Sequence, residues 1–232
     1  MSLRQRLYNF TSNQVKLKMK NLLLIFLLLT SWGYSQDWST DTYQYGELYE
    51  GFIVLKDGEK VYGHIKYQNR VKMQDEIVFY RDKDDPGTKK RYYPKDLVEY
   101  QVGDKYYHSL NNYGSKVGFT PKAVLVRNNG CLITYVFYER SSEYNKLVQG
   151  DEEDKEELAN RKYPETLLVR EHDSEEIYKV EELQEGFDKI MSKLVKSNKE
   201  LASRIKQKVS GYTYDRFDHI VEEFNNECSS SK

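Results

Sequence analysis

The sequence has no hydrophobic run long enough to cross a membrane as a helix. Its longest is Leu22–Leu29, eight apolar residues, which rise only ~12 Å as a helix against a hydrocarbon core of ~30 Å. Lys16, Lys18 and Lys20 precede this run, and the small-x-small triplet Gly33-Tyr34-Ser35 follows it. A short apolar run between two such flanks is typical of a secretory signal peptide.

We therefore expect residues 1–35 to form a signal peptide that is cleaved between Ser35 and Gln36. Met19, directly before Lys20, is itself a typical first residue for such a leader, so the true start can be Met19. Gln36 offers no thiol for lipid attachment. The alternative is a leader retained as an N-terminal anchor, which its shortness disfavours. The cleaved protein would be periplasmic or extracellular, with no permanent membrane span.

Cysteine is scarce, because Cys131 and Cys228 are the only two among 232 residues. An exported chain meets an oxidising environment, so these two residues are candidates for a single disulfide. Closing a loop of nearly a hundred residues would stabilise the fold by ~4–5 kcal/mol. The alternative is that Cys131 is a small apolar strand residue and Cys228 lies in a frayed C-terminus.

Neither sign of charge is in large excess, with 36 basic and 37 acidic residues. Residues 1–35 hold five basic residues and no acidic one, so their removal leaves a net charge of −6. Nucleic acid is not expected as a partner, because phosphate binding needs a basic patch. The 21 tyrosines instead suit half-buried strands, where the ring packs and the hydroxyl reaches the rim.

Common catalytic and nucleotide-binding motifs are also missing: Gly-x-Ser-x-Gly, the P-loop, Gly-x-Gly-x-x-Gly and His-Glu-x-x-His. The four histidines are scattered over different predicted elements. His219 shares a helix face with Glu222 and Glu223, but a metal there would still need a third ligand and an open position. We therefore predict no catalytic, cofactor-binding or metal-binding residue from the motifs.

An acidic stretch between two predicted strands resembles the start of a calcium loop. Asp82, Asp84 and Asp85 supply the carboxylates, but position twelve of that loop would be Tyr93 and not glutamate. A solvated hairpin loop explains the stretch better.

Turn residues between β-rich runs predict a series of hairpins. Asp57-Gly58, Gly103-Asp104 and Asn128–Gly130 are the clearest turns, and both residues of Asp57-Gly58 are expected to take positive φ. The pair of strands around Asn128–Gly130 is the most apolar, so we place it centrally in the sheet. The predicted strands cover residues 51–56, 59–67, 76–81, 89–93, 97–102, 105–110, 122–127, 131–138, 165–171 and 176–180.

From Leu183 onward the apolar residues recur at the helical period of 3.6. The stripe predicts one helix to about Lys208, ended by Ser210-Gly211, and a second helix after Thr213. Strands followed by helices predict an α+β fold: an antiparallel β-meander sheet or a partly open barrel built from hairpins, followed by two C-terminal amphipathic helices.

We expect four regions along the chain. They are the leader (1–35), a lead-in (36–48), a β-rich domain (49–180) and a C-terminal helical clasp (181–228) packed on the sheet. Within the β-rich domain, the charged residues 149–162 predict a mobile loop or a solvated helix turn.

Five segments of this sequence together carry a resemblance to a group of known proteins. They are the leader end Tyr34-Ser35-Gln36, the opening Gly51–Ile65, the Tyr93–Asp96 step into a strand, the Asn129-Gly130 hairpin and the terminal Phe224–Cys228. Together they resemble a broad group of uncharacterised exported proteins of Bacteroidetes-type bacteria. The group has no assigned activity, so the resemblance implies fold and location only.

These observations favour an exported, non-enzymatic protein of the cell envelope. It would bind another macromolecule, an envelope protein or a glycan, or act as an accessory module, with no cofactor. Two alternatives stay open. One is a periplasmic hydrolase whose site assembles from dispersed residues, Asp82, Asp84, His108, His172 and His219. The other is a small-ligand carrier, which needs a cavity inside a closed sheet.

Overall fold

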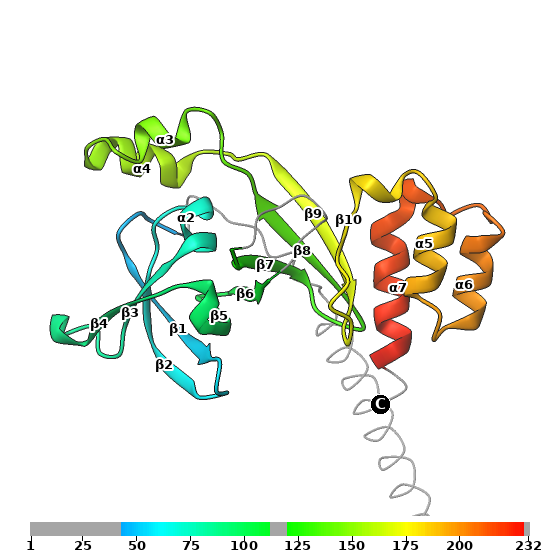
Figure 1. Ribbon diagram of the computed structural model, residues 1–232, viewed down its shortest axis with the longest axis horizontal. Helices are drawn as coiled ribbons and strands as arrows, with labels where there is room; N and C mark the ends of the chain where they lie inside the picture. The colour runs from blue at the N-terminus through cyan, green and yellow to red at the C-terminus, as the bar shows by residue number, and fades with distance from the viewer. Residues whose placement is uncertain (1–42, 112–119, 230–232) are drawn as a thin grey trace, which may run out of the picture. The chain divides into compact units, whose positions relative to one another are not determined.

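The computed structural model describes residues 43–111 and 120–229 (Figure 1). They belong to one compact unit, residues 36–232. The predicted leader, residues 1–35, and its cleavage site at Ser35 and Gln36 lie outside the described residues. Within the two described ranges, no helix combines the length and the apolar character needed to span a membrane.

In the part of the chain that the structure describes, ten strands form a single antiparallel sheet with helices beside it, and the sheet is open, which confirms the α+β class. Its spatial order is β10-β9-β8-β7-β6-β5-β1-β2-β3-β4, so β5 and β1 are the one pair of neighbours not consecutive in the chain. The strands are β1 (Leu48–Leu55), β2 (Lys60–Lys66), β3 (Ile77–Tyr80), β4 (Lys89–Tyr92), β5 (Leu97–Val102), β6 (Lys105–Leu110), β7 (Lys122–Asn128), β8 (Leu132–Tyr138), β9 (Glu165–Glu171) and β10 (Tyr178–Lys179).

The first hairpin, β1–β2, has the predicted position but a different turn. Gly58 has a φ of +90°, whereas Asp57 does not have a positive φ. The expectation of positive φ at both residues was therefore wrong. The backbone N–H of Leu55 donates to the carbonyl of Glu59 at 2.9 Å, which places a wider turn between the strands and leaves only one left-handed position, filled by glycine.

Alternation along β2 and the residue after it separates a core face from a solvent face. Ile65 is fully buried and Tyr67 is 2% exposed, whereas Tyr62 is 68% exposed. The core face packs in a cluster that extends across β1, β3, β5, β6 and β8.

A short helix that the sequence did not reveal, α2 (Arg70–Asp75), packs against this core. Asn69 begins it, because its side chain accepts a hydrogen bond from the backbone N–H of Lys72. The buried Gln74 amide then forms two hydrogen bonds with the backbone of Tyr138 in β8, at 2.7 and 2.8 Å. Only six residues long, α2 gives too short a periodic signal to be recognised in the sequence.

The charged segment 149–162 proves to be more than a loop or a solvated turn. It contains α4 (Glu152–Asn160), which follows α3 (Tyr144–Leu147). Leu158 and Ala159 are buried, and the hydroxyl of Tyr67 donates to the carbonyl of Ala159 at 3.2 Å. Two apolar residues among many charges are enough to dock this helix on the core.

The helical clasp contains three α-helices and not the two that were predicted. They are α5 (Phe187–Leu194), α6 (Lys199–Lys206) and α7 (Phe217–Ser229), with short 3₁₀ turns at Glu181–Leu183 and Tyr214–Arg216. The expected single helix from 183 to 208 is interrupted, because Asn198 caps α6 by accepting a hydrogen bond from the N–H of Leu201. Apolar residues keep their helical spacing across the interruption, so the spacing gave no sign that a new helix begins after Asn198.

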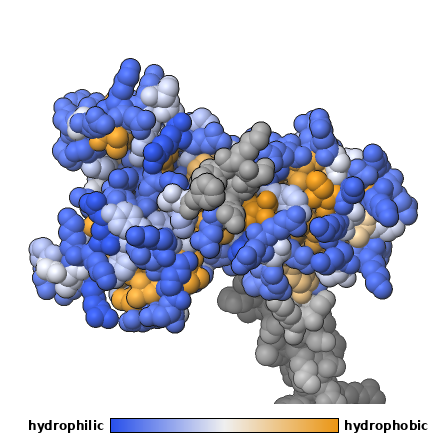
Figure 2. Space-filling model, in the orientation of Figure 1, coloured by the Kyte–Doolittle hydropathy of each residue, from blue (hydrophilic) through white to orange (hydrophobic). Residues whose placement is uncertain are grey.

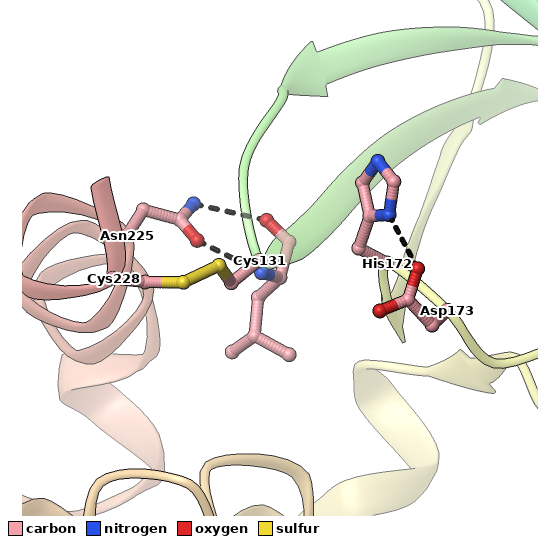
Figure 3. Close-up of a disulfide and its surroundings, with 6 residues drawn as sticks. Cys131, His172, Asp173, Asn225 and Cys228 are labelled. Atoms are coloured by element: carbon pink, nitrogen blue, oxygen red, sulfur yellow. Dashed lines mark hydrogen bonds and ion pairs between the residues drawn. A yellow bond between two sulfur atoms is a disulfide. The ribbon is translucent and has the colours of Figure 1, made fainter. Parts of the chain in front are cut away.

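Helix α7 is held to the β7–β8 hairpin by three separate interactions, of which Figure 3 shows the disulfide and the Asn225 hydrogen bonds. Cys131 and Cys228 form a disulfide with their Cα atoms 6.4 Å apart. The Asn225 amide accepts from the N–H of Leu132 at 2.8 Å and donates to the carbonyl of the same residue at 2.9 Å. On the exposed side, Arg127 makes a bidentate ion pair with Asp218.

Replacing Asn225 with alanine should lower the free energy of unfolding by about 2 kcal/mol. The backbone N–H and the backbone carbonyl of Leu132, which are partly buried, would both lose their hydrogen bond to the Asn225 amide. The exposed Asn129 of the same β7–β8 turn supplies the matched control, and Asn129→Ala should change stability by less than about 0.5 kcal/mol. Urea titrations of the two variants check this. Equal effects at the two positions would show that Asn225 does not hold α7.

Candidate functional site

A groove opens on the solvent side of the sheet, across β1, β2 and β5. It has a volume of about 680 Å³, and we name it the sheet groove. Ten residues line it: Glu50, Gly51, Phe52, Lys60, Tyr62, Gly63, His64, Arg81, Gln101 and Gly103.

Glycines at the groove allow neighbouring strands to approach closely. Gly51 and Gly63 are directly paired across β1 and β2. A Cβ on Gly51 would overlap the backbone of Gln101 in β5, and one on Gly63 would overlap the carbonyl of Tyr80 in β3. Glycine at these strand positions marks a close backbone approach.

Aromatic rings and one cation form one side of the groove. The rings of Phe52 and Tyr62 meet edge to face, with centroids 5.9 Å apart. The Lys60 ammonium lies 3.5 Å from the Phe52 centroid and 5.2 Å from the Tyr62 centroid. Tyr62 is the large hydrophobic side chain with the greatest exposure in the described part of the chain, at 68%. The groove therefore presents an open ring face beside a positioned positive charge.

The polar groups of the groove are mostly unused by the fold. Lys60, Arg81 and Glu50 are exposed, and none of the three forms an ion pair within the described ranges. Gln101 donates from its amide to the carbonyl of Gly103 at 2.8 Å. The Nδ1 atom of His64 is buried and has no hydrogen-bond partner in the structure. An unsatisfied buried nitrogen is a group that a fold seldom keeps without reason.

Rings continue from the groove along the same face of the sheet. Centroid distances are 6.2 Å from Phe52 to Tyr106, 5.1 Å from Tyr106 to His108 and 5.6 Å from His108 to Tyr135. We name Phe52, Tyr106, His108 and Tyr135 the ring row. Phe52 and Tyr135 at its two ends are buried, and Tyr106 and His108 between them are partly buried.

A hydrogen-bond network fixes the Tyr135 end of the ring row. The hydroxyl of Tyr135 accepts a hydrogen bond from Arg170 Nε at 2.8 Å and lies 3.0 Å from His108 Nδ1. Burial raises the pKa of Tyr135 to about 12, although Arg170 acts to lower it, so this phenol keeps its proton. Because arginine can only donate hydrogen bonds, the Tyr135 hydroxyl accepts from Arg170 and donates its own proton in a hydrogen bond to His108 Nδ1. The proton of the neutral imidazole then resides on Nε2, which faces Glu99 at 3.8 Å.

His108 is neutral at pH 7 in this network. Burial is the largest cause that lowers its pKa to about 4, and electrostatic interaction with Arg170 and His172 acts in the same direction. The nearby Glu99 would favour the charged form, but burial outweighs it. Glu99 also hydrogen-bonds Tyr106, and burial followed by this bond raises the pKa of Tyr106. The network thus holds rings in place and offers no charged histidine for catalysis.

The residues proposed for a dispersed hydrolase site are held mostly by local contacts, and of the five only His172 and His108 are shown to influence each other. Asp82 and Asp84 bond within their own loop, where Asp82 accepts from the N–H of Asp84 at 3.0 Å. His172 pairs with Asp173 in the β9–β10 turn at 3.0 Å (Figure 3). His219 pairs with Glu223 on α7 at 3.6 Å. Across residues 43–111 and 120–229, no three His, Cys, Asp or Glu side chains gather in a way that could hold a metal ion.

Sequence reasoning found part of this surface and missed the rest. Within the predicted strand 59–67, the period of two puts Lys60, Tyr62 and His64 on one face. Arg81 and Gln101 come from other strands or their ends, and only the pairing of β2 with β3 and of β1 with β5 brings them to the groove. No local sequence signal specifies those pairings.

Comparisons with known proteins matched no family model, no curated protein and no solved structure. The roles of the groove residues are therefore inferred from their geometry and chemistry.

Proposed function

We propose that this protein is an exported, non-enzymatic binding module of the cell envelope, and that its ligand is a glycan bound in the sheet groove. The observation that supports this most is the open face of Tyr62 in a groove that also holds Glu50 and Arg81, neither of which forms an ion pair in the described ranges. Sugar rings offer apolar C–H faces and many hydroxyls, so they match one exposed aromatic ring surrounded by Gln101, Glu50 and Arg81.

A glycan suits this surface better than a protein partner does. Protein interfaces have an apolar core, and a contiguous apolar patch of several hundred Å² would mark one. The large hydrophobic side chains most exposed in the described ranges are only Tyr62, Tyr93, Val98 and Val209. On the face shown in Figure 2, hydrophobic residues form small patches surrounded by hydrophilic ones.

The open sheet also weighs against the carrier alternative. A small-ligand carrier of the kind considered would enclose its ligand inside a closed sheet, whereas this sheet ends at β4 and β10 without closing. A shallow groove on an open sheet gives access to one stretch of a long polymer.

Replacing Tyr62 with alanine should weaken glycan binding by about tenfold, because the stacking face is lost. Retardation of the purified protein in native gels that contain dextran, galactan or polygalacturonate measures the affinity. Tyr93→Ala removes another exposed tyrosine outside the groove and should leave the retardation unchanged. Absence of retardation by every polysaccharide, or equal effects of the two variants, would contradict glycan binding at this groove.

Export is tested separately by N-terminal sequencing of the protein from envelope and medium fractions. We expect the sequence to begin at Gln36. A protein that keeps its leucine-rich leader, or that accumulates reduced in the cytosol, would contradict export.

A further inference from the structure

We propose that the sheet groove selects glycans that carry carboxylates, that is, polyuronic chains, through Arg81 and Lys60. This inference rests on the proposed function and adds the chemical class of the ligand.

The charge within the groove is opposite to the charge of the mature chain. Arg81 and Lys60 are two cations against the single carboxylate of Glu50, whereas the chain without residues 1–35 has a net charge of −6. Some lysines and arginines elsewhere in the described ranges pair with acids, as Arg127 does with Asp218 and Arg161 with Glu143. Two cations left unpaired in one groove on an acidic protein favour an anionic ligand.

Lys60 is positioned before any ligand arrives. Its ammonium lies over the Phe52 ring at 3.5 Å, and this cation–π contact restrains a side chain that is otherwise flexible. A restrained ammonium loses less conformational entropy when it binds a carboxylate. The Tyr62 ring lies 5.2 Å from the same ammonium, so a sugar stacked on Tyr62 places its substituents near a fixed positive charge.

Arg81 provides the group that matches a carboxylate best. It follows β3 directly, and β3 pairs with β2 through His64 and Tyr80, which brings Arg81 to the groove from a second strand. A guanidinium binds a planar carboxylate with two parallel hydrogen bonds, which a lysine cannot do. Because hydrogen bonds between two charged groups are stronger than those between neutral groups, the preference for an acidic over a neutral chain should be about tenfold.

The experiment compares galacturonate oligomers with galactose oligomers of the same length by calorimetric titration of the purified full-length gene product. We expect the acidic oligomer to bind about tenfold more tightly. Arg81→Gln and Lys60→Gln should each reduce that preference several-fold, while Lys83→Gln, which removes an exposed cation outside the groove, should not. Thermal unfolding of each variant shows whether it is folded, and two separate groove variants keep the test valid if one is not.

Each outcome bears on one proposal. Equal binding of acidic and neutral oligomers, both weakened by Tyr62→Ala, would overturn carboxylate selection and leave glycan binding intact. Binding of dextran sulfate as tight as that of polygalacturonate, with the same dependence on Arg81, would show attraction by charge alone and would also overturn it. Binding of neither oligomer would overturn the proposed function itself.

Discussion

Replacing Cys131 and Cys228 together with serine should lower the free energy of unfolding by about 4–5 kcal/mol. The two residues are 97 positions apart, and a cross-link over a loop of this length removes that much conformational freedom from the unfolded chain. The far-UV circular dichroism of the folded protein should be unchanged, because the clasp keeps its own buried core, which includes Met191, Ile205 and Ile220.

Urea titration of the oxidised wild type and of the double serine variant measures this difference. The wild type in dithiothreitol should have the same stability as the serine variant, since both lack only the cross-link. Non-reducing peptide mapping should also recover the two cysteines in one linked peptide pair. Unchanged stability with free thiols in protein isolated from the envelope would show that Cys131 is only a small apolar strand residue.

Acidification from pH 6.5 to 4 should cost the protein about 3 kcal/mol through His108 alone. The pKa of His108 is lowered to about 4 in the folded protein, against ~6.5 when unfolded, and each pKa unit corresponds to ~1.36 kcal/mol. The unfolded chain therefore binds this proton first. The stability that depends on a neutral His108 is complete above pH 6.5, decreases as the pH falls, and is absent below about 4.

If His108 were protonated in the folded state, its Nδ1 atom could no longer accept the hydrogen bond from the Tyr135 hydroxyl. Protonation would also add a positive charge near Arg170. His108→Asn removes the titrating group. Between pH 6.5 and 4 the variant should therefore lose about 3 kcal/mol less of its free energy of unfolding than the wild type does. His219→Asn replaces an exposed histidine and should follow the wild-type profile. Parallel profiles for wild type and His108→Asn would show that the imidazole is not buried in a neutral form.

The strand pattern was predictable because it is local. Turn residues such as Asp57-Gly58, and alternation such as that of Ile65 and Tyr67 against Tyr62, reflect interactions over a few residues. The break between α5 and α6 escaped detection for a related reason. A stripe with a period of 3.6 persists through a short interruption, and Asn198 resembles any other polar residue until its side chain is seen to cap the helix.

The site was predictable only in part, since it depends on contacts between distant strands. The Tyr135 hydroxyl joins His108 and Arg170, which are 62 positions apart in the sequence, and no spacing rule connects them. Histidines and acids drew attention as candidate catalytic groups, yet burial keeps His108 neutral and Asp82 is used in its own loop. Exposure of a single tyrosine beside unpaired cations carried more functional information than any titratable cluster.

Hydrogen exchange with and without saturating galacturonate oligomers tests the central claim most directly, because it locates the ligand on the chain. We expect slower exchange in peptides that cover residues 48–66 and 80–82, which border the sheet groove, and no change in the helical clasp, residues 181–228. Protection confined to the clasp, or protection in residues 48–66 that persists in Tyr62→Ala at equal ligand occupancy, would contradict a glycan stacked on Tyr62 in the groove.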